Sequence, residues 1–116
     1  MDVICNLDVI PGKVPPVIQV SQRDPPTALV FKLYASSGTL SLPSSGITAA
    51  MRGMRNNGAQ LVETGMFSID QNIPQVRFDS VTPMIAVPGK SVYEMLLTDG
   101  TNDLYTENFI IQVLEV

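Results

Sequence analysis

Residues 86–116 read AVPGKSVYEMLLTDGTNDLYTENFIIQVLEV, and this stretch decides the fold. A Pro-Gly turn at 88–89 precedes an apolar run over 91–98. A polar turn over 99–103 separates that run from a second apolar run over 104–116. Both runs carry β-branched or aromatic residues at alternate positions, which is typical of strands. The stretch therefore predicts a long antiparallel hairpin that closes the domain.

The segments upstream show the same alternation, with turn signals every few residues. Further strands are predicted over residues 2–10, 17–22, 27–34, 47–55, 59–69 and 75–79. Thr82-Pro83 resembles a helix N-cap followed by proline, so at most one short helical turn is predicted, over 82–86. No stretch sustains the apolar spacing of a longer helix. The sequence therefore predicts an all-β fold, an antiparallel β-sandwich (immunoglobulin-like) of about seven to eight strands, as one domain over residues 1–116.

Prolines mark the N-terminal segment. Pro15-Pro16 and Pro25-Pro26 lack the N–H groups that a central strand needs. Residues 1–26 are therefore interpreted as either an edge strand or an arm that docks on a neighbouring molecule. The Ser/Gly/Pro-rich loop over 35–46 carries two apolar residues, Leu40 and Leu42, which are predicted to tuck under the sheet edge.

Asn56-Asn57-Gly58 lies between two alternating apolar runs. Asn and Gly tolerate the positive φ angles of a type I′ turn, so a hairpin of that type is predicted. Met51, Met54 and Met66 fall in or beside its strands. They are interpreted as adaptable core filling, with a methionine-lined binding surface as the alternative.

The chain has few charges with which to cover its surface. Charged residues are 16% of its 116 residues, against 45% apolar residues, and the net charge is −4. Scarce polar cover favours self-association. The chain has only seven Lys and Arg residues, whereas binding to nucleic acid needs a basic surface, so nucleic acid is not predicted as a partner. The sequence contains no apolar run long enough to span a membrane and starts without a positively charged n-region, so neither membrane insertion nor a signal peptide is predicted.

The residue types needed for catalysis or metal binding are missing or scattered. There is no histidine, and Cys5 is the only cysteine, which removes His-based nucleophile pairs and thiolate zinc clusters. Cys5 lies on the apolar face of its predicted strand and is interpreted as a small buried hydrophobe. Asp99 and Asp103 have the look of a calcium loop but lack its further acidic ligands. We therefore predict no catalytic residues, no metal, no cofactor and no enzyme.

Several motifs occur in a recognisable order along the chain. They are the Gln-x-Asp after the second strand (Gln22, Asp24), the Pro-Gly-x-x-x-Tyr step (Pro88, Gly89, Tyr93) and the terminal Thr-x-x-Phe-x-x-x-Val (Thr106, Phe109, Val113). In this order the chain resembles the N-terminal domain of phage baseplate upper proteins, from phages and prophages of Gram-positive bacteria. The chain departs from that pattern at its hairpin tip, Arg55-Asn56-Asn57-Gly58, and at its double prolines.

The resemblance implies a structural role in the virion tail, with no cofactor or active site. Such domains fix a tail fibre or receptor-binding protein to the distal hub, in trimeric or higher assemblies with other tail proteins. Phe109 would serve as a core anchor and Thr106 as a hydroxyl that bonds locally at a strand start. The alternative is a small-molecule or carbohydrate-binding β-sandwich, which the absence of Trp and the seven Tyr and Phe residues disfavour.

The two faces of the closing hairpin predict where contact with another protein occurs. Its core face would carry Tyr93, Met95 and Leu97 with Phe109, Ile111 and Val113. The opposite face would then carry Val92, Leu96, Ile110 and Leu114, which is more apolar than a water-facing side needs. A register slip of one residue would exchange the two faces. We expect Ile110→Glu or Leu114→Glu to weaken assembly while sparing the fold.

Overall fold

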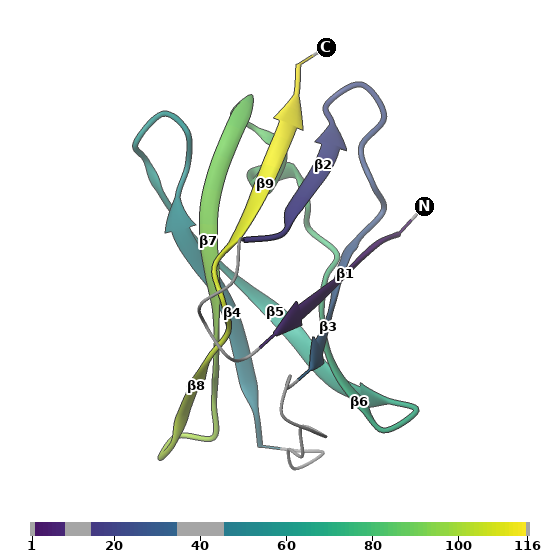
Figure 1. Cartoon of the computed structure of the whole chain (residues 1–116), viewed down its shortest axis with the longest axis vertical. Helices are drawn as coiled ribbons and strands as arrows, with labels where there is room; N and C mark the ends of the chain where they lie inside the picture. The colour runs from purple at the N-terminus through teal and green to yellow at the C-terminus, as the bar shows by residue number, and fades with distance from the viewer. Residues whose placement is uncertain (1, 9–14, 35–45, 116) are drawn as a thin grey trace.

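The computed structural model describes residues 2–8, 15–34 and 46–115, and this part of the chain is almost entirely β-structure (Figure 1). The nine strands are β1 (Val3–Asp8), β2 (Val17–Ser21), β3 (Leu29–Tyr34), β4 (Thr48–Met54), β5 (Gln60–Asp70), β6 (Ile73–Phe78), β7 (Gly89–Thr98), β8 (Asp103–Tyr105) and β9 (Phe109–Leu114). One 3-10 turn, η1 (Thr82–Ile85), lies between β6 and β7. The predicted all-β class and the single helical turn are confirmed, with nine strands instead of seven to eight.

Two sheets share the long strand β5. Sheet A has the order β1-β3-β6-β5, and sheet B continues as β5-β4-β7-β9-β2, with β8 paired to β7. Gly65 of β5 pairs with Ala49 of β4, whereas the next residue, Met66, pairs with Arg77 of β6. The strand thus changes sheets at Gly65, a residue type that favours a tight bend between sheets. The result is a nearly closed β-sandwich (Figure 1).

The strands at the two ends of this order run parallel to their neighbours. β1 pairs in parallel with β3, and β2 pairs in parallel with β9, whereas the other six strand pairings are antiparallel. The predicted antiparallel β-sandwich therefore holds for six of the eight pairings, and the parallel pairings at its two ends were not predicted. Alternation identifies a strand but carries no information on the direction of its partner. Leu40 and Leu42 lie outside the described residues.

One core fills the space between the sheets. Its largest fully buried side chains are Tyr93, Phe31, Phe109, Leu7, Leu29, Leu33, Met51, Met95, Leu97, Ile111 and Val76. The Phe31 ring, from sheet A, lies with its centroid 4.9 Å from that of Phe109, from sheet B. Such contacts join the two sheets into one hydrophobic unit.

The closing hairpin buries the face that its alternation predicts. Tyr93, Met95 and Leu97 are buried together with Phe109, Ile111 and Val113. The second run is not one strand, however, because residues 106–108 interrupt it between β8 and β9. β8 continues the tight hairpin with the end of β7, and β9 pairs with the beginning of β7.

The tight turns differ from the predicted types. The hairpin between β4 and β5 is confirmed, but positive φ occurs there at Gly58 alone (φ 86°), and the Gly58 N–H donates to Arg55 O. This is the geometry of a longer loop that ends in a bulge, not a type I′ turn. Positive φ at both central residues occurs instead at Gln71 (49°) and Asn72 (65°), in the two-residue loop between β5 and β6.

Two smaller expectations also change. Met51 fills the core as predicted, but Met54 and Met66 are 52% and 67% exposed, so the core assignment was wrong for both. Each lies on the side of its strand opposite to the buried residues. The N-cap of η1 is Val81 and makes no side-chain capping bond, so Thr82 is the first helical residue and not the cap.

Candidate protein-contact surface

The outer face of sheet B carries a continuous line of apolar side chains. Strand register brings Met54 of β4 beside Val92 of β7, Val92 beside Ile110 of β9, and Ile110 beside Val17 of β2. We call Val17, Met54, Val92 and Ile110 the apolar row. Val17, Met54 and Val92 are 48%, 52% and 47% exposed, and Ile110 is half-buried. The apolar row crosses four adjacent strands. A molecule that binds there would bury these apolar side chains away from water, which favours binding.

A hollow lies beside the apolar row. It has a volume of about 620 Å³, and β5, β4 and β7 contribute most of its lining. Met54, Val62 and Val92 supply apolar side chains to its wall, and Val62 is 66% exposed. Gln60 and Asn108 add carboxamide groups at its margin. The outer face of sheet B is therefore hollowed and mixed in chemistry, which suits contact with a shaped partner.

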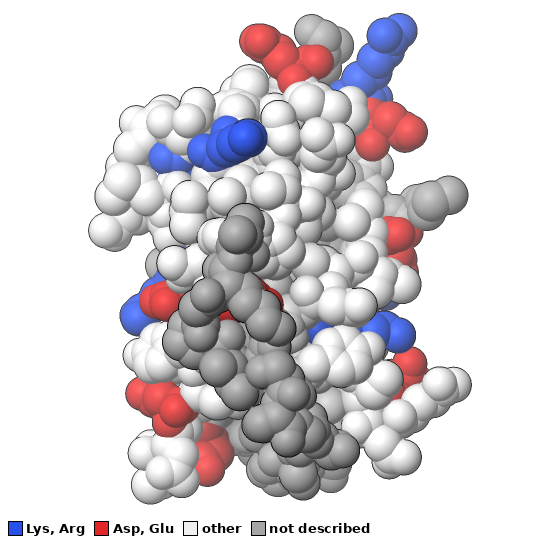
Figure 2. Space-filling model, in the orientation of Figure 1, with Lys and Arg blue, Asp and Glu red and all other residues white. Residues whose placement is uncertain are grey.

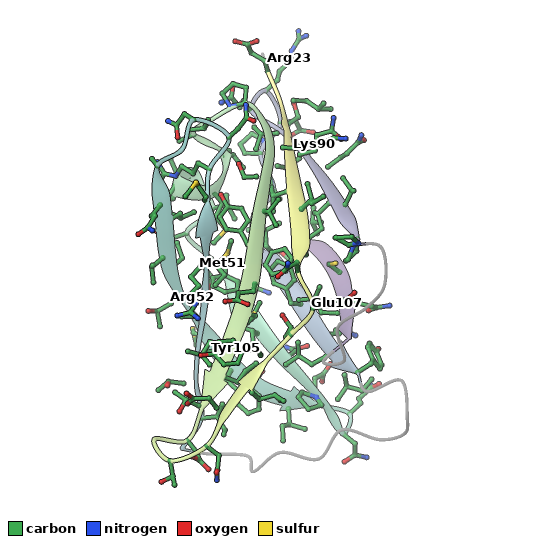
Figure 3. The ribbon with its side chains drawn as sticks, turned by 60° about the vertical axis from the view of Figure 1, so that its left-hand side comes forward. Arg23, Met51, Arg52, Lys90, Tyr105 and Glu107 are labelled. Atoms are coloured by element: carbon green, nitrogen blue, oxygen red, sulfur yellow. The ribbon has the colours of Figure 1, made fainter. Side chains whose placement is uncertain are left out.

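One ion pair stands on the same face. Arg52 Nε donates to Glu94 Oε1 at 3.1 Å, and the two residues are cross-strand partners in β4 and β7. The Arg52 guanidinium also lies 5.3 Å from the centroid of the Tyr105 ring, and Figure 3 shows both residues on the same side of the sheet. The Glu94 contact raises the pKa of Arg52, which therefore keeps its charge. An exposed pair of this kind adds little to stability.

The structure brings together part of the predicted contact residues. Val92 and Ile110 are direct cross-strand neighbours. Leu96 is half-buried further along β7, between Ala50 and Tyr105. Leu114 is 44% exposed at the far end of β9, beside Ser21. All four face outward, but only Val92 and Ile110 belong to the apolar row.

Sequence reasoning missed Val17 and Val62, and it placed Met54 on a binding surface only as the alternative to core filling. The signal for each was present in the alternation: Ile18, Met51 and Leu61 are buried, so Val17, Met54 and Val62 fall on the other side of their strands. What the sequence did not contain was the order of the strands, which is needed to see these residues become neighbours.

The motif residues at the end of β2 and the start of β7 hold the framework. Gln22 Nε2 donates to Ile85 O at 2.8 Å and to Ala86 O at 3.4 Å, which ties the end of β2 to η1. Asp24 lies exposed in the following turn. Gly89 has φ 99°, which L side chains rarely adopt. The hydrogen bonds of Gln22 and the backbone conformation of Gly89 therefore contribute to the framework of the fold.

Pro88 and Gly89 also receive the tip of the β4–β5 hairpin. The backbone N–H of Asn56 donates to Ser91 Oγ at 2.9 Å, and Asn56 Nδ2 donates to Pro88 O at 3.1 Å. A methyl group on Gly89 would lie 2.5 Å from Asn56 Nδ2. The Pro-Gly step thus lies against the Asn56 side chain, which would have to move if position 89 carried a larger residue.

The terminal motif also acts within the fold. Thr106 is buried; its Oγ1 accepts the Met95 N–H at 3.1 Å and donates to Glu107 O at 3.0 Å. Phe109, Tyr93 and Val113 are buried in the core. Burial raises the pKa of Tyr93 above its ordinary value.

The polar turn before β8 is closed by Asp99. Its Oδ1 accepts the backbone N–H groups of Thr101 at 2.8 Å and Asn102 at 2.7 Å, and these bonds hold its pKa below the ordinary value. Within the described residues, no group of three or more acidic or Cys side chains is placed to hold a metal ion. Asp99 therefore acts here as a turn cap.

Cys5 lies at the other end of the strand order, in β1. Its side chain packs against the core, and desolvation, with a smaller effect of the Glu107 carboxylate, raises its pKa to about 11. The thiol is therefore protonated near neutral pH and a poor nucleophile. No helix in the described segments is long and apolar enough to cross a membrane.

Comparison with known proteins adds one finding. No protein-family model matches the chain, and no curated protein matches its sequence. The strand order and the shared β5 define a class of nearly closed two-sheet β-sandwiches. Among solved structures, the N-terminal domain of phage TP901-1 ORF48 is similar to this chain, with a TM-score of 0.68, 97% of each chain covered and 12% identity. The likeness shows a shared fold along nearly the whole of both chains.

Proposed function

We propose that this chain is a structural domain of a phage or prophage tail. In this role it sits at the baseplate or fibre attachment, self-assembles, and docks a receptor-binding or fibre module. The observation that carries the proposal is the fold shared with a phage protein domain over 97% of both chains. The apolar row supports it, because an assembly domain needs a surface whose burial repays association.

The proposal implies particular partners and a location. The partners are other phage tail proteins and further copies of the chain, and the location is the virion tail. Figure 2 shows few charged groups among broad uncharged areas on the side of the molecule that it presents, which suits protein contact better than contact with nucleic acid. A trimer is the symmetry that the family resemblance implies.

The test is to find the chain in particles. Tail-bearing particles from the strain that encodes it are purified by density gradient, and the chain is detected by mass spectrometry and by antibody label in electron micrographs. We expect the chain to co-sediment with tails and the label to fall at the distal tail end. A chain found only in particle-free fractions would contradict the proposal.

The hollow on sheet B is the one observation that favours a small-molecule or carbohydrate-binding module. Its volume of about 620 Å³ lies within the range of ligand sites. The one aromatic residue in its lining is Tyr93, which is buried, whereas carbohydrate sites stack sugars on exposed rings. We expect a glycan array to show no selective binding; selective binding that Val62→Glu abolishes would favour this second function.

A further inference from the structure

Arg55 differs from the other arginines in how its charge is compensated. Arg52 and Arg77 form ion pairs with carboxylates, and Arg23 is exposed to solvent. Arg55 is half-buried, its Nε atom is fully buried, and no acidic side chain of the described residues pairs with it. A guanidinium keeps its charge in proteins, so partial burial without a counter-charge is costly. The fold therefore holds a cation that lacks its anion.

A second buried group without a partner lies beside Arg55. Tyr93 is 1% exposed, and its hydroxyl, like Arg55 Nε, makes no hydrogen bond in the described part of the chain. Burial raises the pKa of the Tyr93 hydroxyl, and the nearby Ser91 and Arg55 side chains oppose that shift, which places all three groups close together. Buried polar atoms in proteins are normally paired. Two neighbouring atoms without partners therefore indicate one missing group that serves both.

Strand register puts Arg55, Ser91 and Tyr93 on one side of sheet B. Gly53 pairs with Tyr93, Arg55 lies two residues beyond Gly53, and Ser91 lies two residues before Tyr93, so all three side chains fall on the core side. Ser91 is 3% exposed, and its Oγ accepts the backbone N–H of Asn56 at 2.9 Å. That bond uses a lone pair, so the Ser91 hydroxyl can still donate its hydrogen. Two hydroxyl donors beside one guanidinium complement an oxyanion.

We propose that Arg55, Ser91 and Tyr93 form a binding site for one carboxylate group, at the end of the sandwich where the β4–β5 hairpin meets Pro88 and Gly89 (Figure 1). The guanidinium fork would hold the two carboxylate oxygens, and the two hydroxyls would donate to the same oxygens. A carboxylate carries one negative charge, which matches one guanidinium, whereas a phosphate group carries about 1.5 to 2. This inference does not depend on the proposed tail role.

The backbone around Arg55 is fixed before any ligand arrives. The Arg55 N–H donates to Ala59 O at 2.8 Å, and Arg55 O accepts the Gly58 N–H at 2.9 Å. The next residue, Asn56, is tied to Pro88 O at 3.1 Å. A site held in this way loses little conformational freedom on binding. Arg55 does not line the hollow on the outer face of sheet B, so that hollow is not the carboxylate site.

The experiment is an NMR titration that observes the arginine Nε–H groups of the wild-type chain at constant pH and ionic strength. Sodium acetate replaces sodium chloride stepwise, and the Arg55→Lys variant assigns the Arg55 signal by its absence. We expect acetate to shift the Arg55 signal with saturation in the millimolar range. The Arg52 and Arg77 signals should not shift, because carboxylates already pair with both side chains.

Variants test the assignment of each group. Arg55→Gln should abolish the rise in melting temperature that acetate gives the wild-type chain. Tyr93→Phe, which removes one donor to a charged group, should lower the affinity for acetate about tenfold. Arg52→Gln is the matched control, and it should bind acetate like wild type. Thermal melts establish that each variant is folded, and the wild-type titration decides the matter if one variant is not.

Two results would overturn the site. One is an Arg55 signal that responds to chloride as it does to acetate. The other is an Arg55 signal that does not respond to acetate, which would mean that an internal water pairs the two groups. Two further probes distinguish the sources of the carboxylate: N-acetylglycine presents a chain-terminal carboxylate, and the α-amide of N-acetylglutamate presents a side-chain carboxylate. Binding of either as tightly as acetate supports a carboxylate on a partner protein, and binding of acetate alone supports a small free acid.

Discussion

Thr106, Ser91 and Glu107 are the polar side chains that the described part of the fold buries. Residues 106–108 lie between β8 and β9 and make no strand pairing. Buried backbone N–H and C=O groups beside this interruption therefore need hydrogen-bond partners from elsewhere, and Thr106 supplies them. The Thr106 hydroxyl accepts the Met95 N–H and donates to Glu107 O. One side chain therefore satisfies two backbone groups at the place where the strand is interrupted.

Thr106→Val is expected to destabilise the fold by about 1–3 kcal/mol, because it keeps the shape and leaves the buried Met95 N–H unpaired. Thr106→Ser keeps the hydroxyl and loses only a methyl group, so its cost should be smaller, about 1 kcal/mol. Urea denaturation followed by circular dichroism measures both. If the Ser variant proves less stable than the Val variant, packing and not hydrogen bonding explains the residue.

Cys5 makes stability depend on pH in the alkaline range. Its folded pKa of about 11 lies above the ordinary thiol value of 9.0, chiefly because burial disfavours the thiolate. Between these values the unfolded chain releases a proton that the folded chain keeps, so the free energy of unfolding falls as pH rises. The contribution is complete below pH 9 and is lost as pH approaches 11.

The measurement compares wild type with Cys5→Val by denaturant titration at several pH values from 7 to 11. Both proteins share their Tyr and Lys titrations, so the difference isolates the thiol. We expect wild type to lose stability relative to Cys5→Val above pH 9. Parallel curves for the two proteins would show that the thiol is solvated in the folded state.

At the scale of elements, β5 carries the architecture, because it is the strand that both sheets share. Gly65 marks the change of partner, and a methyl group there would lie 2.5 Å from Val76 Cγ1 and 2.8 Å from the Phe78 ring. Both neighbours are buried and surrounded by other core side chains. The bend therefore leaves no room for a side chain at this point.

Gly65→Ala should destabilise the fold by about 1–3 kcal/mol through overpacking. Thr64→Ala, at the exposed neighbouring position, is the matched control and should change stability by less than about 1 kcal/mol. In a double-mutant cycle Val76→Ala should make the Gly65→Ala change less costly, because it removes the clashing methyl group. Additive effects of the two changes would contradict the proposed clash.

The positions of the strands and their buried faces were the features that the sequence predicted best. Alternation located the strands and named the buried face of the closing hairpin, since burial follows a period of two. Turn types were less predictable: Asn57-Gly58 suggested a type I′ turn, yet that turn forms at Gln71-Asn72. Strand pairing and loop length decide between turn types, and both depend on residues distant in sequence.

At the scale of the whole molecule, the parallel ends and the apolar row could not be read from the sequence. Each depends on which strands become neighbours, and local alternation is the same for parallel and antiparallel partners. Val92 and Ile110 were predicted because they belong to one hairpin. Val17 joins them through a strand that is about ninety residues away, as the Gln19–Gln112 contact shows.

The shared core predicts that both sheets unfold together. Phe109 contacts Phe31 across the sheets, so Phe109→Ala should cost about 3–5 kcal/mol and weaken both. Near-ultraviolet and far-ultraviolet circular dichroism should give coincident transitions in wild type and in the variant. Separate transitions would show that sheets A and B are independent folding units.

The parallel pairing of β2 with β9 has a consequence for biosynthesis. Gln19 and Gln112 are 93 residues apart in the chain. Ribosomes add about 5–20 residues each second. The segment of β2 therefore waits about 5–20 seconds, without its ladder partner, before β9 has been synthesised. During that interval its Val and Ile side chains are open to nascent-chain chaperones, and Pro15-Pro16 beside them limits wrong strand pairing.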